Sequence, residues 1–245
     1  MQAIPRGRIA AIDYARTVAL LGMAVYHFTY DLTVFGALPP GMASQGVWRD
    51  FARLVAGSFL ALSGVSLFLA HGQGLRLRPF LRRLALVGLA AGAVSLATWV
   101  MMPEFFVFFG ILHSIAVSSV IGLAFLRAPG VVTLLVAALF LALPAVFRAY
   151  GLSPDWPVWL GLSGLNRPTM DFEPVFPWTG VFLAGLGVAQ LTARLGGLDA
   201  LSRWRLRGGR VHAAMAWPGR HSLAIYLIHQ PVLFGAVYVW ANFIR

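Results

Sequence analysis

The sequence contains no cysteine and no lysine, and charged residues make up only 11% of its 245 positions. Without cysteine, the chain can form no disulfide, no thiolate metal site and no cysteinyl acyl-enzyme. Typical soluble domains carry about a quarter charged residues, so this content, with 59% hydrophobic residues, argues against a soluble fold. The basic side chains are all arginines and give a formal charge of +11. In a soluble protein this charge would suggest nucleic acid, but here we interpret it as a record of membrane topology and expect no nucleic-acid partner.

Long apolar runs recur along the whole chain, each close to the roughly 20 residues that an α-helix needs to cross a bilayer. We expect seven spans, at residues 16–38, 54–69, 84–102, 105–126, 131–147, 175–191 and 222–243. The first run follows a basic segment without a small-residue cleavage site, so we expect it to stay uncleaved. The sequence thus predicts an all-α, polytopic transmembrane helix bundle, with residues 1–245 forming a single integral-membrane domain in the lipid bilayer. We interpret four glycines as positions of close helix packing, namely Gly57, Gly64, Gly88 and Gly92.

The arginines separate by side when alternate connections are assigned to opposite faces of the membrane. Thirteen fall on one side: Arg6, Arg8, Arg76, Arg78, Arg82, Arg83, Arg127, Arg194, Arg203, Arg205, Arg207, Arg210 and Arg220. Five fall on the other: Arg49, Arg53, Arg148, Arg167 and Arg245. Because positive charge concentrates on the cytoplasmic side, we predict a multi-pass protein of the cytoplasmic (inner) membrane with a cytoplasmic N-terminus and an external C-terminus.

The stretch MAVYHFTYDL, residues 23–32, places His27 and Asp31 one helical turn apart inside an apolar run. Counting residues along each span puts His27, His113 and His229 near the bilayer midplane. Ionisable groups at that depth generally face the bundle interior or a cavity and are functional candidates. We favour a catalytic role for His27 with Asp31, because a carboxylate that orients an imidazole is the arrangement that general-base catalysis needs.

Other interpretations of the histidines stay open. Each ring could simply hydrogen-bond a neighbouring helix, and His229 could bind carbonyl groups that Pro231 leaves free. The same groups could form a proton relay in a transporter. Paired histidines can also ligate haem, but these three lie on separate spans without a second matching pair. No metal-ligand spacing stands out, and we expect no metal.

Four stretches of the sequence resemble a known family. RIAAIDYARTVALLGMAVYHFTYDL resembles the first span of transmembrane acyltransferases, in which an arginine, an aspartate and an arginine precede a membrane histidine. The segment from Ser58 to Val87, with its SG pair and basic loop, resembles the second span, and GRHSLAIYLIHQPVL resembles the last. With FGILHSIAVSS, these stretches are most similar to bacterial membrane proteins related to the catalytic domain of heparan-alpha-glucosaminide N-acetyltransferase, from about Arg8 to Leu233.

The resemblance implies an enzyme that takes an acyl group from cytoplasmic acyl-CoA, with acetyl-CoA expected, and delivers it to a hydroxyl or amine of an extracytoplasmic glycan. Catalytic candidates are His27, Asp31, His113 and His229, with His27 as a general base or as a transient acyl carrier. Arginine pairs well with phosphate oxygens, so candidates for the coenzyme are Arg16, Arg76, Arg78, Arg82 and Arg83. Candidates for the acceptor are Arg49, Asp50, Asp171, Glu173 and Trp178.

Two departures from the family pattern stand in the first span and the segment that follows it. Thr17 occupies the place where a glycine commonly follows the arginine. The segment TVFGALPPGMASQGVW, residues 33–48, has no histidine where the lysosomal enzyme carries one with a catalytic role. A proton-coupled transporter of a small glycan precursor, or a noncatalytic membrane subunit, is therefore the alternative function. The sequence allows a homo-oligomer.

Overall fold

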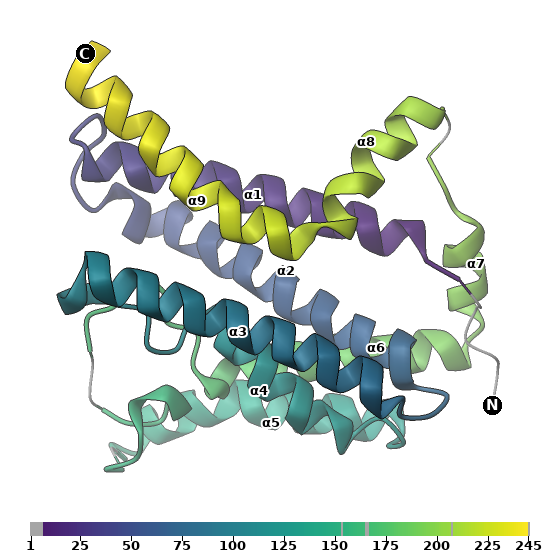
Figure 1. Cartoon of the computed structure of the whole chain (residues 1–245). Coiled ribbons are helices and arrows are strands. Elements are labelled where there is room, and N and C mark those ends of the chain that lie inside the picture. The colour runs from purple at the N-terminus through teal and green to yellow at the C-terminus, as the bar shows by residue number, and fades with distance from the viewer. Residues whose placement is uncertain (1–6, 153, 165–166, 207, 245) are drawn as a thin grey trace. The chain divides into compact units, whose positions relative to one another are not determined.

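The computed structural model describes residues 7–152, 154–164, 167–206 and 208–244. Within these ranges the chain is helical and forms no strand beyond one isolated bridge, so the all-α prediction is confirmed. The main helices are α1 (Ala10–Val34), α2 (Gly46–His71), α3 (Leu77–Met101), α4 (Ile111–Leu123), α5 (Gly130–Ala149), α6 (Val175–Arg194), α7 (Gly197–Arg203), α8 (Gly209–Arg220) and α9 (Ser222–Val239) (Figure 1). Short 3-10 turns lie at Met42–Ser44, Pro103–Phe105 and Val158–Leu160, and a π-helical turn at Trp240–Ile244. Of the arginines used for orientation, Arg6, Arg207 and Arg245 lie outside the described residues.

The helices form two compact units, and α2 is divided between them after Phe59. The first, which we name the terminal unit, comprises Gly7–Phe59 and Leu201–Arg245. The second, which we name the central unit, comprises Leu60–Ala200. The prediction of a single domain over residues 1–245 stays a prediction.

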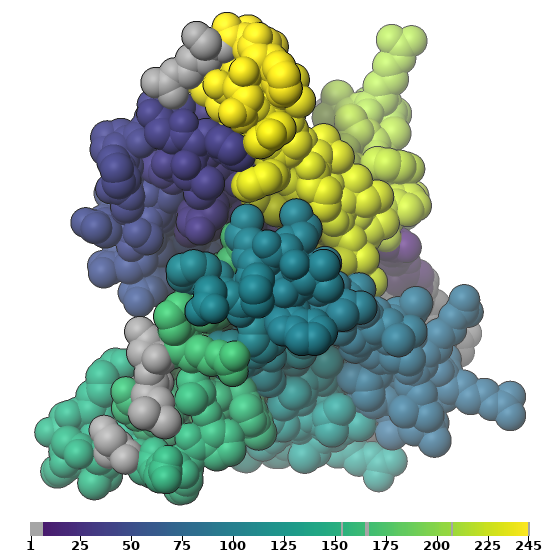
Figure 2. Space-filling model, turned by 60° about the vertical axis from the view of Figure 1, so that its left-hand side comes forward, coloured from purple at the N-terminus to yellow at the C-terminus, as the bar shows by residue number. Residues whose placement is uncertain are grey.

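In the terminal unit, α1 packs along both α8 and α9. In Figure 2 the yellow C-terminal helix lies directly against the purple and indigo N-terminal segment. The α1 and α8 backbones approach so closely that a Cβ at Gly219 would collide with the Asp13 carbonyl oxygen. Farther along, the Phe35 and Phe234 rings lie 5.1 Å apart. Segments from the two ends of the chain therefore share one helix layer.

In the central unit, α6 packs against α5 and α4, and α4 against α3. Small residues allow the closest crossings, as expected where apolar helices meet without a hydrophobic driving force. A Cβ at Gly64 would strike the Phe182 carbonyl oxygen. Gly88 and Gly92 face no atom within 4 Å, so the packing interpretation is correct for Gly64 and wrong for these two.

Among the residues that the structure describes, five helices are long and apolar enough to cross a membrane: α2, α3, α5, α6 and the helix running from Ser222 to Ile244. Two other expected spans differ from this group. Helix α1 has 25 residues but carries Asp13, Arg16 and Asp31. Helix α4 has 13 residues, about 20 Å of helix, because residues 106–110 are not helical and the helix ends at Leu123. The seven-span count therefore stays a prediction.

Candidate functional site

A polar cluster lies between α1 and α9 in the terminal unit. The His27 and His229 rings are 5.0 Å apart between centroids and meet at 63°. One turn along α1, Asp31 is fully buried, and its Oδ1 accepts a hydrogen bond of 2.9 Å from Gln230 Nε2. We name His27, Asp31, His229 and Gln230 the paired-histidine cluster. It joins two residues of the first long helix to two of the last.

The cluster brings together three of the four predicted catalytic residues. Counting depth along separate spans had placed His27 and His229 at similar levels, and their rings do meet. The carboxylate differs from the expectation. Asp31 was expected to orient His27, but its hydrogen bond is with Gln230.

Three atoms of the cluster have no hydrogen-bond partner among the described residues although they are buried: Asp31 Oδ2, His229 Nε2 and Gln230 Oε1. Leaving a buried polar atom unpaired costs about 1–3 kcal/mol, so such atoms in a native protein call for an explanation. The carboxylate and amide oxygens can only accept a hydrogen bond. A group that donates hydrogen bonds would satisfy them.

His113, the fourth predicted catalytic residue, lies in the central unit at the start of α4. Its Nδ1 accepts a hydrogen bond of 3.2 Å from the Gly110 backbone N–H, so the ring proton is on Nε2 in the neutral form. Nε2 lies 3.3 Å from Ser95 Oγ, which donates at 2.5 Å to the Val107 carbonyl. Both ring nitrogens are therefore engaged, and the ring joins α3 to the start of α4.

Asp171, in the connection between α5 and α6, also contacts the start of α4. Its Oδ2 accepts a hydrogen bond of 2.9 Å from the Ile111 N–H, in the first turn of α4, where a carboxylate is favourable. Burial raises the pKa of Asp171 to about 6, and the Ile111 hydrogen bond opposes this shift. Next to it, the Glu173 N–H donates to the Phe109 carbonyl at 3.1 Å. Two predicted acceptor-binding residues thus anchor a connection to α4.

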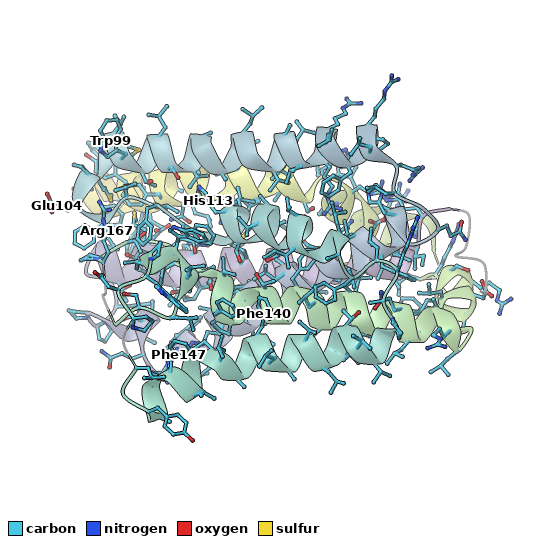
Figure 3. All side chains as sticks on the ribbon, turned by 90° about the horizontal axis from the view of Figure 1, so that it is seen from below. Trp99, Glu104, His113, Phe140, Phe147 and Arg167 are labelled. Carbon is cyan, nitrogen blue, oxygen red and sulfur yellow. The ribbon has the colours of Figure 1, made fainter. Side chains whose placement is uncertain are left out.

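The other predicted acceptor-binding residues are Arg49, Asp50 and Trp178. Arg49 and Asp50 belong to the terminal unit and form an exposed ion pair of 3.4 Å. Trp178 lies in α6 of the central unit, half-buried. Figure 3 places Trp99, Glu104 and Arg167 toward one end of the central unit, with His113 farther inward.

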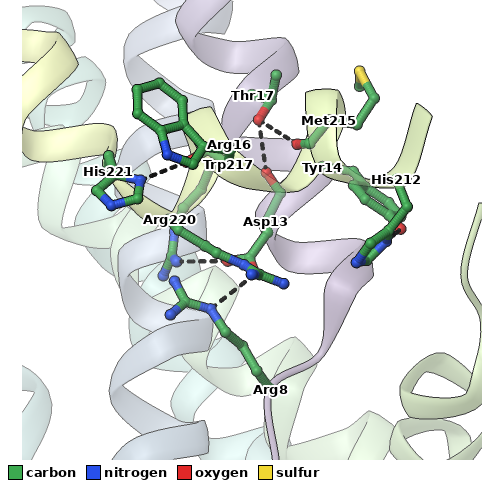
Figure 4. A network of polar contacts seen from close by, with 10 residues as sticks. All are labelled: Arg8, Asp13, Tyr14, Arg16, Thr17, His212, Met215, Trp217, Arg220 and His221. Carbon is green, nitrogen blue, oxygen red and sulfur yellow. Dashed lines mark hydrogen bonds and ion pairs between the residues drawn. The ribbon is translucent and has the colours of Figure 1, made fainter. Parts of the chain in front are cut away.

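At the start of α1, three guanidinium groups surround one buried carboxylate. Asp13 Oδ2 lies 2.8 Å from Arg8 Nε and 3.5 Å from Arg220 Nε, and Oδ1 lies 3.5 Å from Arg16 (Figure 4). The Asp13 side chain is 2% exposed, whereas those of Arg8 and Arg220 are 54% and 42% exposed. We name these four residues the arginine cluster. Its net charge is about +2, since three positive groups share one negative group.

Neighbouring hydrogen bonds fix the arginine cluster to α8. Thr17 Oγ1 donates to the Met215 carbonyl at 2.6 Å, beside the close contact at Gly219. The Tyr14 hydroxyl lies 2.5 Å from His212 Nδ1 (Figure 4). It also accepts a hydrogen bond of 3.3 Å from the Leu206 N–H. Thr17 therefore ties α1 to α8.

The remaining predicted coenzyme-binding residues lie in the central unit, at the end of α2 and the start of α3. Arg78, Arg82 and Arg83 border a shallow surface hollow with Pro79 and Leu86. Arg76 turns back and donates to the Ala70 carbonyl at 3.2 Å. Arg16 is the one predicted coenzyme residue of the terminal unit.

Four cluster residues were not selected from the sequence: Gln230, Arg8, Asp13 and Arg220. Gln230 follows His229 directly in a predicted span. An amide at that depth needs a hydrogen-bond partner, so the sequence alone indicates that Gln230 is a candidate site residue. Arg8 and Arg220 were assigned only to topology. Asp13 could have identified them, because an aspartate at the start of an apolar helix needs positively charged groups beside it.

Among the described residues, no group of three or more histidine, cysteine or acidic side chains could hold a metal ion. No curated protein and no solved structure matches the chain. The family model described as heparan-alpha-glucosaminide N-acetyltransferase, catalytic, matches residues 8–231, a stretch that includes both clusters. With its several long apolar helices, the chain is therefore a multi-pass membrane protein that belongs to the transmembrane acetyltransferase family of the heparan-alpha-glucosaminide N-acetyltransferase catalytic domain.

Proposed function

We propose that the protein transfers an acetyl or other acyl group from cytoplasmic acyl-CoA to a hydroxyl or amine of an extracytoplasmic glycan. The paired-histidine cluster receives the nucleophile of the acceptor. The arginine cluster receives phosphate groups of the coenzyme. The membrane is the cytoplasmic (inner) membrane, as the arginine distribution along the sequence favours.

The unpartnered acceptors of the paired-histidine cluster carry this proposal. A hydroxyl or amine donates hydrogen bonds, so it matches Asp31 Oδ2, Gln230 Oε1 and His229 Nε2. The carbonyl oxygen of an acyl thioester only accepts hydrogen bonds, and these atoms would not bind it. The cluster therefore suits the nucleophile better than the acyl donor. A histidine beside the nucleophile supplies the base that acyl transfer requires.

The arginine cluster supports the binding of the acyl donor, acyl-CoA. Arg8 and Arg220 are partly exposed and share a single carboxylate, so their guanidinium groups keep donors available for phosphate oxygens. Asp13 and His27 lie about four helical turns apart on α1, about 21 Å along its axis. The two clusters thus lie on one helix at different depths, as transfer from one side of a membrane to the other requires.

The other predicted residues keep narrower proposed roles. Arg76, Arg78, Arg82 and Arg83 form a second basic surface that attracts the anionic coenzyme. Arg49, Asp50 and Trp178 contribute to glycan binding. Asp171 and Glu173 support the connection that carries them, and His113 supports α4.

The test uses purified protein in nanodiscs with acetyl-CoA and two probe acceptors, glucosamine for an amine and methyl glucoside for a hydroxyl. Released coenzyme thiol is measured with a thiol reagent, to which a chain without cysteine gives no background. We expect acetylated product from the wild type. Asp31→Asn should lower transfer at least tenfold while acetyl-CoA binding is kept. Arg220→Gln should weaken acetyl-CoA binding, whereas the exposed Arg53→Gln should not.

An absence of both acetyl-CoA binding and thiol release in the wild type would contradict the proposal. The transporter alternative instead predicts glycan flux that follows a pH gradient and needs no coenzyme. The noncatalytic alternative predicts that Asp31→Asn changes only the thermal stability.

A further inference from the structure

The position of the ring proton on His229 follows from one hydrogen bond. His229 Nδ1 lies 2.6 Å from the Tyr226 carbonyl oxygen, within a single turn of α9. A carbonyl oxygen can only accept, so Nδ1 must carry the proton. In the neutral ring Nε2 is then an unprotonated acceptor. Because the partner is the backbone of the same helix, α9 itself sets this tautomer.

The other ring nitrogen of His229, Nε2, is able to accept a proton. It is buried without a hydrogen-bond partner among the described residues, as are Asp31 Oδ2 and Gln230 Oε1. The His27 ring stands edge-on at 5.0 Å, and the Tyr226 ring lies at 5.8 Å. A general base needs one nitrogen held by an acceptor and the other free to take a proton, and His229 has both.

His27 lacks this arrangement. No hydrogen bond joins its ring to another described residue, and its neighbours are the rings of Tyr26 at 5.5 Å and His229. Asp31, which would have oriented it, is bonded to Gln230 instead. Nothing in the described contacts selects one tautomer of His27.

We propose that His229, rather than His27, is the proton acceptor of the transfer; this inference rests on the proposed function. His229 Nε2 takes the proton from the acceptor hydroxyl or amine as its oxygen or nitrogen attacks the thioester carbonyl. The new acyl bond forms, and the carbon–sulfur bond breaks with its electron pair passing to sulfur. The imidazolium then returns the proton to the coenzyme thiolate, so the neutral ring is restored.

The kinetic test compares variants in nanodiscs with acetyl-CoA, glucosamine and methyl glucoside. His229→Asn places an amide nitrogen near the position of Nδ1, keeping the bond to Tyr226 but removing Nε2. We expect it to lose transfer at least a hundredfold, as removal of a general base does, with acetyl-CoA binding unchanged. His27→Gln should lose less than tenfold. Imidazole added to His229→Ala should restore part of the rate.

The exposed His221 provides the matched control. Like that of His229, the Nδ1 atom of His221 lies close to a backbone carbonyl of the preceding turn, 2.9 Å from the Trp217 oxygen. His221 is not part of the paired-histidine cluster. His221→Ala should therefore keep the wild-type rate. A hundredfold loss in His27→Gln with less than tenfold in His229→Asn would overturn the proposal and return the base to His27.

A second measurement needs no activity. Nitrogen NMR of histidine-labelled protein, with the His229 signals identified by their loss in His229→Asn, reports which ring nitrogen carries the proton. We expect the proton on Nδ1. A proton on Nε2 would overturn the inference even if acetyl transfer is observed. Failure of the proposed function is distinct, because the wild type would then neither bind acetyl-CoA nor release thiol.

Discussion

One carboxylate, that of Asp171, makes the stability of the folded protein depend on pH. Its pKa is raised to about 6 in the folded protein by burial, above an ordinary value of 3.8. Between these two values the folded state binds more protons than the unfolded state, so stability falls as the pH rises through this window. Above the folded pKa the contribution no longer changes. Over the whole window this contribution changes the free energy of unfolding by about 3 kcal/mol.

We expect Asp171→Asn to reduce the fall in stability between pH 4 and pH 6. The amide oxygen can still accept the hydrogen bond from Ile111, but the side chain no longer titrates. Thermal unfolding in detergent at a series of pH values measures the effect. Asp155→Asn, which changes an exposed carboxylate of the same connection, is the control. Equal pH slopes in wild type and Asp171→Asn would contradict the assignment.

At the scale of residues, the sequence predicts well what depends on spacing along one helix. His27 and His229 could be matched because each depth follows from a count of 1.5 Å per residue. The Asp31–Gln230 bond could not be predicted, because it depends on the rotation of α9 against α1. A helix pair at equal depth can present many different faces, and spacing alone does not choose between them.

At the scale of elements, two glycines determine how closely α2 and α6 approach. A Cβ at Gly64 would collide with the Phe182 carbonyl, and one at Gly185 with the Ala61 carbonyl. Both obstacles are backbone atoms, which cannot rotate away. The two helices would have to separate to accommodate a methyl group.

We expect Gly64→Ala to destabilise the protein by roughly 1–3 kcal/mol or more, as overpacking does. Gly88→Ala is the matched control, because it adds the same methyl group to an apolar helix where no atom lies within 4 Å. That variant should be neutral or slightly more stable, since alanine favours helix by up to about 1 kcal/mol. Thermal unfolding of the two variants in one detergent compares them. Similar melting temperatures would mean that this crossing does not require glycine.

Element boundaries show where sequence prediction fails. The run 105–126 is mostly apolar and predicts a full span, yet α4 begins only at Ile111. The residues before it bind the connection that precedes α6, with Met170 N–H donating to the Phe105 carbonyl at 2.9 Å. Hydropathy cannot distinguish a helix from an apolar segment whose backbone groups are satisfied by another part of the chain.

At the scale of the whole molecule, the number of crossings decides on which side each site opens. If α4 crosses, the arginine distribution gives a cytoplasmic N-terminus and an external C-terminus. If it does not, every connection after α4 changes side relative to those before it. The phosphate-binding and glycan-binding roles of the predicted loops therefore depend on whether the number of crossings is odd or even, which we call the parity.

A chain without cysteine allows this parity to be measured with single introduced thiols. Glu104→Cys and Arg127→Cys, both at exposed positions, bracket α4. With seven spans, a membrane-impermeant maleimide should label the first in intact spheroplasts and the second only after permeabilisation. Asp155→Cys and Arg205→Cys bracket the long apolar α6 and should show the same contrast. Labelling of Glu104→Cys and Arg127→Cys from one side would mean that α4 returns without crossing, as its length of about 20 Å permits.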